Sequence, residues 1–174
     1  MSYKKHFNFL SKNDLDFVTK EVKNIFTSPL STYKTNITHW KPNIVHNKQT
    51  VLIYQLSPKT TIYNLILKTC KEKLKKSPSF IMVYYWTSGS YIPWHEDDHA
   101  SSAGTLYLNE SWDLSWGGLY NCIIKEKIET ITPTYNLLVE QFDGMPHSTI
   151  PTTDFAPIRT TIQMFFPFKN SFIQ

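Results

Sequence analysis

The sequence is poor in cysteine and glycine and contains no long apolar run. Of its 174 residues, two are cysteines, Cys70 and Cys122, and five are glycines. So few cysteines in a chain of this length, without a recognisable secretion signal, favour reduced core thiols over a disulfide framework. No stretch approaches the roughly 20 apolar residues of a membrane-spanning helix. We therefore expect a cytoplasmic protein that makes no contact with a membrane.

Charge of neither sign dominates the sequence. Lysine and arginine total 18, aspartate and glutamate total 14, and the formal net charge is +4. A basic excess this small does not by itself indicate nucleic-acid binding. The clearest basic run, KTCKEKLKK at 68–76, has the spacing of the solvated side of a helix.

Apolar and aromatic residues, by contrast, are plentiful. Hydrophobic residues make up 41% of the chain and aromatic residues 15%. This proportion is sufficient for a core, and the abundance of aromatic side chains favours strands. The length suits a single domain that spans residues 1–174.

Two helices are predicted in the first half of the chain and a series of strands in the second. Residues 12–26 and 58–75 carry apolar residues at helical spacing, and Ser11 with Asp14 resembles a capping box before the first of them. Strands are expected where short apolar and aromatic runs lie between Gly, Pro, Asp and Asn residues: 80–86, 105–108, 119–124, 135–142 and 159–166. This order predicts an α+β fold, mainly β, with the helices on one sheet face.

The last expected strand has two faces of different character. Ile162, Met164 and Phe166 form an apolar face, while Arg159, Thr161 and Gln163 form a polar one. Since the strand is otherwise rich in apolar residues, a polar face indicates a lined cavity.

The segment WHEDDH at 94–99 concentrates possible metal ligands. In an extended chain, His95 and Asp97 point to the same side, and Glu96 and Asp98 point away. His99 shares the parity of His95, but it would be a ligand only if the strand continued through Asp98, and the sequence that follows is typical of a loop.

A third ligand must come from elsewhere, and His147 is the best candidate. Two histidines and one carboxylate on one side of a metal are typical of non-haem Fe(II) oxygenases. Arg159 adds specificity, because a lone arginine inside a barrel is costly unless it meets an anion, and its guanidinium is the bidentate partner of a carboxylate. The hydroxyl of Thr161 shares that face.

These residues resemble the Fe(II)/2-oxoglutarate-dependent dioxygenases, and specifically their prolyl-4-hydroxylase-like branch. The resemblance covers about residues 80–168. It rests on Tyr85 and Gly89 leading to His95-x-Asp97, on YLNESWDLSWGGLY at 107–120, on His147, and on Arg159-x-Thr161.

The resemblance implies a double-stranded β-helix, or jelly roll, with the early helices packed on its major sheet. Residues 1–78 would supply the helical buttress and substrate-groove elements, and 79–174 the jelly-roll core. It also implies a role for each matching residue: His95, Asp97 and His147 as iron ligands, Arg159 as the partner of the distal carboxylate of 2-oxoglutarate, and Tyr107, Thr161 and Tyr85 as further cosubstrate-binding residues. The cofactors would be Fe(II), 2-oxoglutarate and O2, with ascorbate as a candidate reductant.

The implied activity is hydroxylation of an unactivated C–H bond. The substrate would be a prolyl or other residue in a peptide or protein, or a free amino acid. One alternative is a non-catalytic jelly-roll module that senses iron or 2-oxoglutarate. Another is an oxidative nucleic-acid demethylase, against which the sparse lysine and arginine around the site argue. Two departures from the family pattern are a slightly long loop at 148–158 and Tyr120, where relatives often carry an aliphatic residue. The sequence leaves the oligomeric state open.

Overall fold

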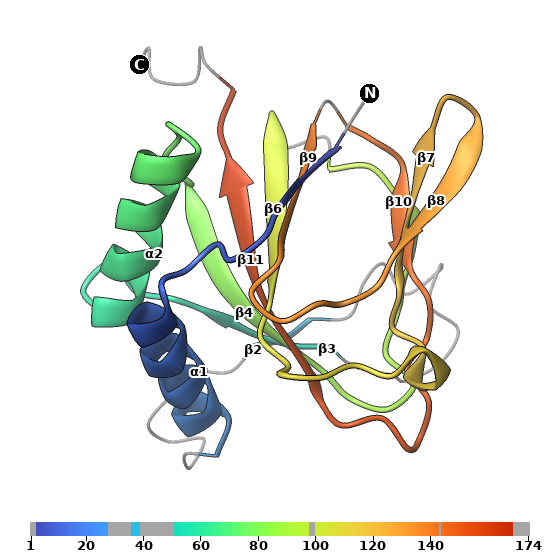
Figure 1. The fold of residues 1–174 in the computed structure, drawn as a ribbon, viewed down its shortest axis with the longest axis horizontal. Helices are drawn as coiled ribbons and strands as arrows, with labels where there is room; N and C mark the ends of the chain where they lie inside the picture. Colours follow the sequence, from blue (N-terminus) through green and yellow to red (C-terminus); the bar gives the residue numbers. More distant parts are fainter. Residues whose placement is uncertain (1–2, 28–35, 39–50, 98–99, 143, 169–174) are drawn as a thin grey trace.

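The computed structural model describes residues 3–27, 36–38, 51–97, 100–142 and 144–168. Two helices and two β-sheets make up this part of the chain (Figure 1). The helices are α1 (Lys12–Thr27) and α2 (Thr61–Lys73), and Leu114–Trp116 forms one turn of 3-10 helix. The strands are β1 (Tyr3–His6), β2 (Asn36–Thr38), β3 (Val51–Gln55), β4 (Phe80–Trp86), β5 (Ile92–His95), β6 (Ser102–Tyr107), β7 (Tyr120–Ile124), β8 (Lys127–Ile131), β9 (Leu138–Phe142), β10 (His147–Thr149) and β11 (Arg159–Phe166).

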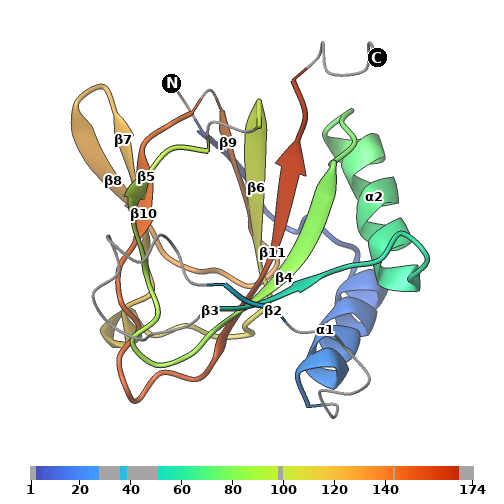
Figure 2. The ribbon, with the colours of Figure 1, turned by 180° about the vertical axis from the view of Figure 1, so that it is seen from behind.

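The strands form a major and a minor sheet that face each other. The seven-stranded major sheet has the order β1-β9-β6-β11-β4-β3-β2, and the four-stranded minor sheet has the order β5-β10-β7-β8. Every pairing is antiparallel. Consecutive strands cross repeatedly between the sheets, as a jelly roll requires. Figure 2 shows the two sheets as opposite walls. The predicted fold class is confirmed.

Helix α1 begins where the sequence indicates. The hydroxyl of Ser11 donates to the Asp14 carboxylate at 2.6 Å, and the backbone N–H of Asp14 donates to that hydroxyl at 3.2 Å. These contacts satisfy polar groups at the helix start. Its buried residues, Leu15, Val18, Val22 and Ile25, recur every three or four positions and turn one face to the sheet.

Helix α2 begins three residues later than Pro58, where we expected it to start. Thr60 is the N-cap, and its hydroxyl accepts from the backbone N–H of Tyr63 at 3.3 Å. The helix ends at Lys73, followed by its C-cap residue Leu74. The basic run after Lys68 is only partly solvated, because Lys76 reaches the buried Glu140 carboxylate at 2.7 Å.

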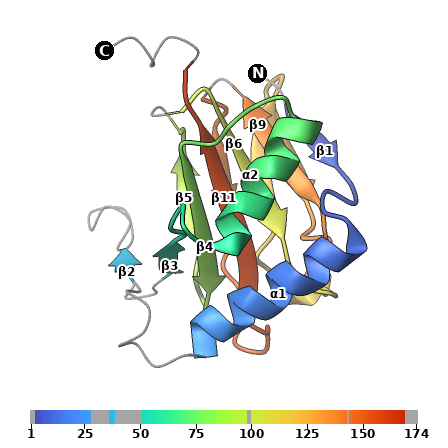
Figure 3. The ribbon, with the colours of Figure 1, turned by 90° about the vertical axis from the view of Figure 1, so that its left-hand side faces the viewer.

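Both helices cover the outer face of the major sheet (Figure 3). The main core lies between the helices and this sheet, and it includes Ile162, Met164 and Phe166 from β11. The alternate residues of that strand, Arg159 and Thr161, are buried on the other side, between the sheets. The prediction that this strand has an apolar and a polar face is therefore confirmed. Its apolar face packs in the core beneath the helices, and its polar face lies between the two sheets.

Several short strands were not predicted. In the first half, β1 pairs with β9 and β3 pairs with β4, so this half extends the major sheet as well as covering it. In the second half, β5, β8 and β10 were missed. All are three to five residues long, and cross-strand pairing stabilises such strands more than their own propensity does.

Two further expectations concern cysteine and membrane spans. Cys70 and Cys122 are buried and free, which confirms that they do not form a disulfide. Neither helix in the described ranges has the length and apolar character to cross a membrane.

Candidate metal and cosubstrate site

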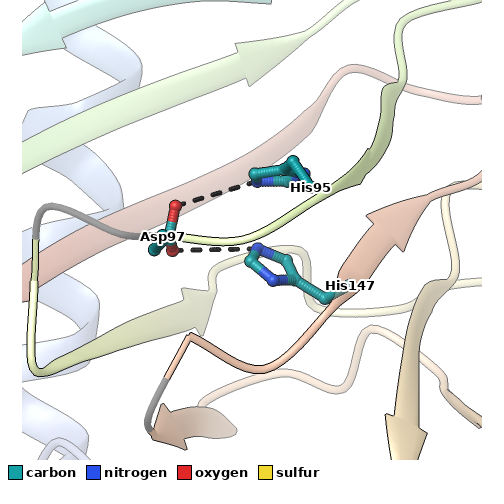
Figure 4. Close-up of side chains that lie close together, drawn as sticks. All are labelled: His95, Asp97 and His147. Carbon is teal, nitrogen blue, oxygen red and sulfur yellow. Dashed lines mark ion pairs between the residues drawn. The ribbon is translucent and has the colours of Figure 1, made fainter.

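Three predicted ligands meet at the inner face of the minor sheet. His95 ends β5 and is the register partner of His147, which begins β10; Asp97 follows β5 by two residues. Figure 4 shows the Asp97 carboxylate facing the two imidazoles, which lie next to each other with their centroids 4.1 Å apart. Its oxygens are 3.8 Å from Nε2 of His95 and 3.7 Å from Nε2 of His147. One ligand atom from each residue lies within 4.8 Å of the others.

Each histidine is oriented by its own backbone neighbourhood. Nδ1 of His95 lies 2.8 Å from the carbonyl of Pro93, and Nδ1 of His147 lies 2.8 Å from the carbonyl of Met145. A carbonyl can only accept, so in each ring Nδ1 carries the hydrogen and Nε2 keeps its lone pair. Hydrogen bonds of this kind fix the tautomer of metal-binding histidines.

Burial keeps His147 in the form that binds metal. Burial, and secondarily the neighbouring His95, lowers the pKa of His147 from 6.5 to about 4, although Asp97 opposes the change. The imidazole is therefore neutral across the physiological range. Two imidazoles and one carboxylate match the donor set of non-haem Fe(II) sites. Within the ranges that the structure describes, no other group of three such side chains comes together.

Glu96, the other described acidic residue of WHEDDH, is not part of this group. Glu96 is exposed, as the alternation of side chains predicted. Asp98 and His99 lie outside the described residues.

The three side chains form one end of a cavity between the sheets. Its empty space amounts to about 470 Å³, including the part open to solvent. Polar and apolar side chains from both sheets line it: Tyr84, Trp86, Ile92, Ala103, Thr105, Tyr107, Tyr120, Gln141, Thr149, Arg159, Gln163 and Phe165, together with the three possible ligands.

Arg159 brings a positive charge into this cavity and is only 2% exposed. Its guanidinium lies over the Trp86 ring, 4.0 Å from the centroid, and its Nη1 donates to the carbonyl of Gly118. Its Nε has no hydrogen-bond partner, and no carboxylate among the described residues pairs with it. Burial lowers its pKa from 12.5 to about 10. A buried cation with an unused donor fits an anionic ligand.

The Thr161 hydroxyl is hydrogen-bonded to Trp86, the side chain over which this cation lies. Its hydroxyl oxygen accepts from Nε1 of Trp86 at 3.0 Å and from Nε2 of Gln163 at 3.2 Å. The amide of Gln163 is fixed in turn, because its oxygen accepts from the Thr105 hydroxyl at 2.8 Å. Both lone pairs of the Thr161 hydroxyl are therefore used, and its hydrogen is left to donate.

Tyr107 belongs to the same wall. It is 1% exposed, and its backbone is paired with Thr161. Burial raises its pKa to about 12 even though Arg159 opposes the change, so the phenol stays protonated and can donate. The structure thus brings Arg159 and Tyr107 to one cavity with the three possible metal ligands, and the buried Thr161 hydroxyl is hydrogen-bonded to two side chains that line it, Trp86 and Gln163.

Comparison with known proteins gives a clear structural result. No protein-family model and no curated protein matches the sequence. Among solved structures, a prolyl-4-hydroxylase from Pseudomonas putida matches with a TM-score of 0.74 and 16% identity, over 96% of this chain and 92% of that one. A Trichoplax adhaerens prolyl hydroxylase, solved with a hypoxia-inducible-factor peptide, matches with a TM-score of 0.72 and 17% identity, over 94% and 83%. A viral collagen prolyl hydroxylase from Paramecium Bursaria Chlorella virus-1 matches at 0.69 and 14%, over 97% of each chain.

The chain has the fold of the prolyl-4-hydroxylase-like 2-oxoglutarate/Fe(II) oxygenases. The matches span nearly the whole chain, including the first half, in which no family signature was found. Because their identities are low, they establish the oxygenase fold and leave the chemistry to be argued from the site.

The paired glycines Gly117 and Gly118 have a physical role at this site. Both have positive φ, +68° at Gly117 and +63° at Gly118. A Cβ on Gly118 would lie 3.2 Å from Nη1 of Arg159 and 3.1 Å from the Trp112 ring. Only glycine combines this conformation with such an approach, so Gly118 lets its carbonyl reach the guanidinium.

Tyr85 is the one predicted site residue that the structure places elsewhere. Its hydroxyl donates to the carbonyl of Val22 at 2.6 Å, and its ring packs on Phe26 with centroids 4.8 Å apart. It thus belongs to the core under the helices. The correction follows from strand parity, since Tyr84 and Trp86 are the β4 residues that line the cavity.

The cavity residues missed from the sequence include Trp86, Tyr120 and Gln141. Trp86 could have been found, because its parity on the predicted strand 80–86 is opposite to that of Tyr85. Gln141 is polar within the apolar run YNLLVEQF, and it shares parity with Val139, which is a weaker signal of an inward-facing side chain.

Proposed function

We propose that this protein is an Fe(II)- and 2-oxoglutarate-dependent dioxygenase that hydroxylates an unactivated C–H bond. The observation that carries the proposal is the unpartnered Arg159 Nε, buried in the cavity that the His95, Asp97 and His147 side chains also line. A metal-type donor set and a cation without an anion in one cavity fit a ligand that bridges them. A dicarboxylate that chelates the metal at one end has that form.

The residues fit both groups. Nε2 of His95, Nε2 of His147 and the Asp97 carboxylate would hold the iron. Arg159, with the Thr161 hydroxyl, would hold the far carboxylate of 2-oxoglutarate, and Tyr107 would add a third donor. When bound, iron and 2-oxoglutarate supply the oxidising chemistry: one O2, one 2-oxoglutarate and one C–H give succinate, CO2 and a C–OH.

The chain's own residues would bind and orient 2-oxoglutarate and shield the reacting groups from water. Trp86 holds the guanidinium from one side and the Thr161 hydroxyl through its indole N–H. Because these donors are fixed before the anion arrives, little ordering is needed on binding. Ile92, Ala103 and Phe165 contribute apolar surface to the cavity, which limits water near the reacting groups.

For the substrate, we propose a prolyl or other amino-acid residue in a peptide or protein, or a free amino acid. The support is the likeness to prolyl hydroxylases, one of which was solved with a peptide. The fold alone does not decide the substrate or the reaction, since a 2-oxoglutarate-dependent epimerase, SnoN, also matches with a TM-score of 0.68.

The test is turnover with paired products. Protein reconstituted with Fe(II) is given 2-oxoglutarate, air and prolyl peptides or free amino acids, with and without ascorbate. We expect succinate to form and the substrate to gain the mass of one oxygen, and the Asp97→Ala variant to produce neither. Protein that binds iron and 2-oxoglutarate but forms no succinate with any substrate would instead favour a non-catalytic sensing module.

A further inference from the structure

A buried chain of two polar side chains leads from the minor sheet to the metal ligands. Tyr120 on β7 and Gln141 on β9 are 5% and 6% exposed. The Tyr120 hydroxyl donates to Oε1 of Gln141. Nε2 of Gln141 donates to Oδ2 of Asp97 at 2.7 Å. The proposed activity does not itself require either residue, so their burial beside the ligands needs an explanation.

The orientation of the Gln141 amide follows from its two neighbours. A carboxylate only accepts hydrogen bonds, so the nitrogen of the amide must face Asp97. The amide oxygen then faces Tyr120, whose hydroxyl must donate. The direction of every hydrogen bond in the chain is thereby fixed.

The same two residues also confine His147. The Tyr120 ring stacks on the imidazole, with centroids 5.5 Å apart and an angle of 26° between the planes. Nε2 of Gln141 lies 3.3 Å from Nδ1 and 3.2 Å from Nε2 of the imidazole. The amide of Gln141 thus contacts both nitrogens of this ring. Two of the three proposed ligands are thus held by one pair of side chains.

We propose that Tyr120 and Gln141 are positioning residues, which hold Oδ2 of Asp97 so that Oδ1 is presented to a divalent metal and which fix the His147 ring. This inference rests on the proposed metal site. With Oδ2 engaged by the amide, Oδ1 is the Asp97 oxygen that would hold the metal. Tyr120 acts on the carboxylate only through Gln141. Contacts of this kind typically contribute about 10- to 100-fold to metal affinity.

The decisive variant is the double substitution Tyr120→Phe with Gln141→Met. Phenylalanine keeps the ring beside His147, and methionine keeps the volume of glutamine. Because both partners of the Tyr120–Gln141 hydrogen bond are removed together, neither of these two groups is left unsatisfied, but Oδ2 of Asp97 loses its amide donor. We therefore expect the metal-free double variant to fold and to melt somewhat below the wild type. Its affinity for Mn(II) or Co(II), measured by titration, should fall about 10-fold or more.

A spectroscopic measurement separates positioning from a general structural role. The visible absorption bands of bound Co(II) depend on the geometry of its ligands, so they should differ between the double variant and the wild type. Gln163→Met is the matched control, because Gln163 lines the same cavity but contacts Thr161 and Thr105 rather than the metal ligands. It should keep both the Co(II) spectrum and the metal affinity of the wild type.

Three outcomes are distinguishable. Wild-type affinity and spectrum in a folded double variant would overturn the positioning role. If the double variant does not fold, the single variant Tyr120→Phe is tested by the same Co(II) comparison. We expect a smaller loss of metal affinity for this variant. An unchanged Co(II) spectrum in it would also overturn the proposal. Failure of the wild type itself to bind any divalent metal would instead refute the proposed function on which this inference rests.

Discussion

Replacement of Arg159 by methionine should have opposite effects on the free and the ligand-bound protein. In the free protein the guanidinium is buried, unpaired with any described carboxylate, and has one unused donor. Substituting an apolar side chain of similar length for such a charge is often neutral or stabilising. We therefore expect the ligand-free Arg159→Met protein to melt at or above the wild-type temperature.

The ligand-bound protein should show a large loss. Truncating one partner of a buried charge pair costs about 2–5 kcal/mol, which is about 30- to 4,000-fold in the dissociation constant of 2-oxoglutarate. Arg159→Lys should recover only part of this affinity, because the ammonium group cannot present a planar fork to the carboxylate. The affinity for Mn(II) should change little, since Arg159 is not among the grouped ligands.

The assay is a thermal melt of Mn(II)-loaded protein with and without 2-oxoglutarate, supported by calorimetric titration. At a concentration 100 times the wild-type dissociation constant, the wild type should gain about 2.7 kcal/mol, or roughly 5–11 °C for a chain of this size. A variant with 100-fold weaker binding should gain only about 0.4 kcal/mol. Equal ligand-induced shifts in both proteins would remove Arg159 from the site, and a ligand-free variant that melts well below the wild type would show that the fold requires it.

Three further predictions concern neighbouring groups. Tyr107→Phe should weaken 2-oxoglutarate binding by about 0.5–1.5 kcal/mol, or somewhat more because the acceptor is charged, in the same titration; no change would mean that the phenol does not donate to it. Gly118→Ala forces a Cβ onto a residue at φ +63°, so it should cost about 1–2 kcal/mol, seen as a lower melting temperature together with weaker 2-oxoglutarate binding. Because the pKa of His147 falls from 6.5 to about 4 on folding, the unfolded chain takes up the proton first as pH falls. The stabilisation that the metal-free protein gains from neutral His147 is thus complete above pH 6.5 and is lost toward pH 4. Urea unfolding across this range should show a shallower decline in stability for His147→Gln than for the wild type.

The sequence predicted which three side chains come together at the candidate metal site because their positions depend on simple geometry. Alternation of side chains placed His95 and Asp97 on one side although β5 ends at His95. The polar residues of β11 stood out because they alternate with core residues. Strands β4 and β11 were predicted with their observed bounds, since each is a long apolar run between clear breaks.

What was missed depends on contacts between distant segments. Tyr85 was assigned to the cosubstrate site through the family resemblance, whereas the parity of β4 turns it toward α1. Tyr120 and Gln141 are in contact only because β7 and β9 lie in opposing sheets. The local sequence around either residue does not predict this contact. The short strands β1 and β10 likewise form by pairing with partners far along the chain.

The central claim is that His95, Asp97 and His147 together hold a divalent iron, and iron content per chain tests it most directly. Wild-type protein, reconstituted with Fe(II) without oxygen and then desalted, should retain about one iron per chain. Asp97→Ala and His147→Ala should retain almost none, because each lacks a ligand of the grouped site. Glu96→Ala, which removes an exposed carboxylate beside the site, should retain as much as the wild type. Iron retained by Asp97→Ala but lost by Glu96→Ala, or no iron retained by any of these proteins, would contradict the account.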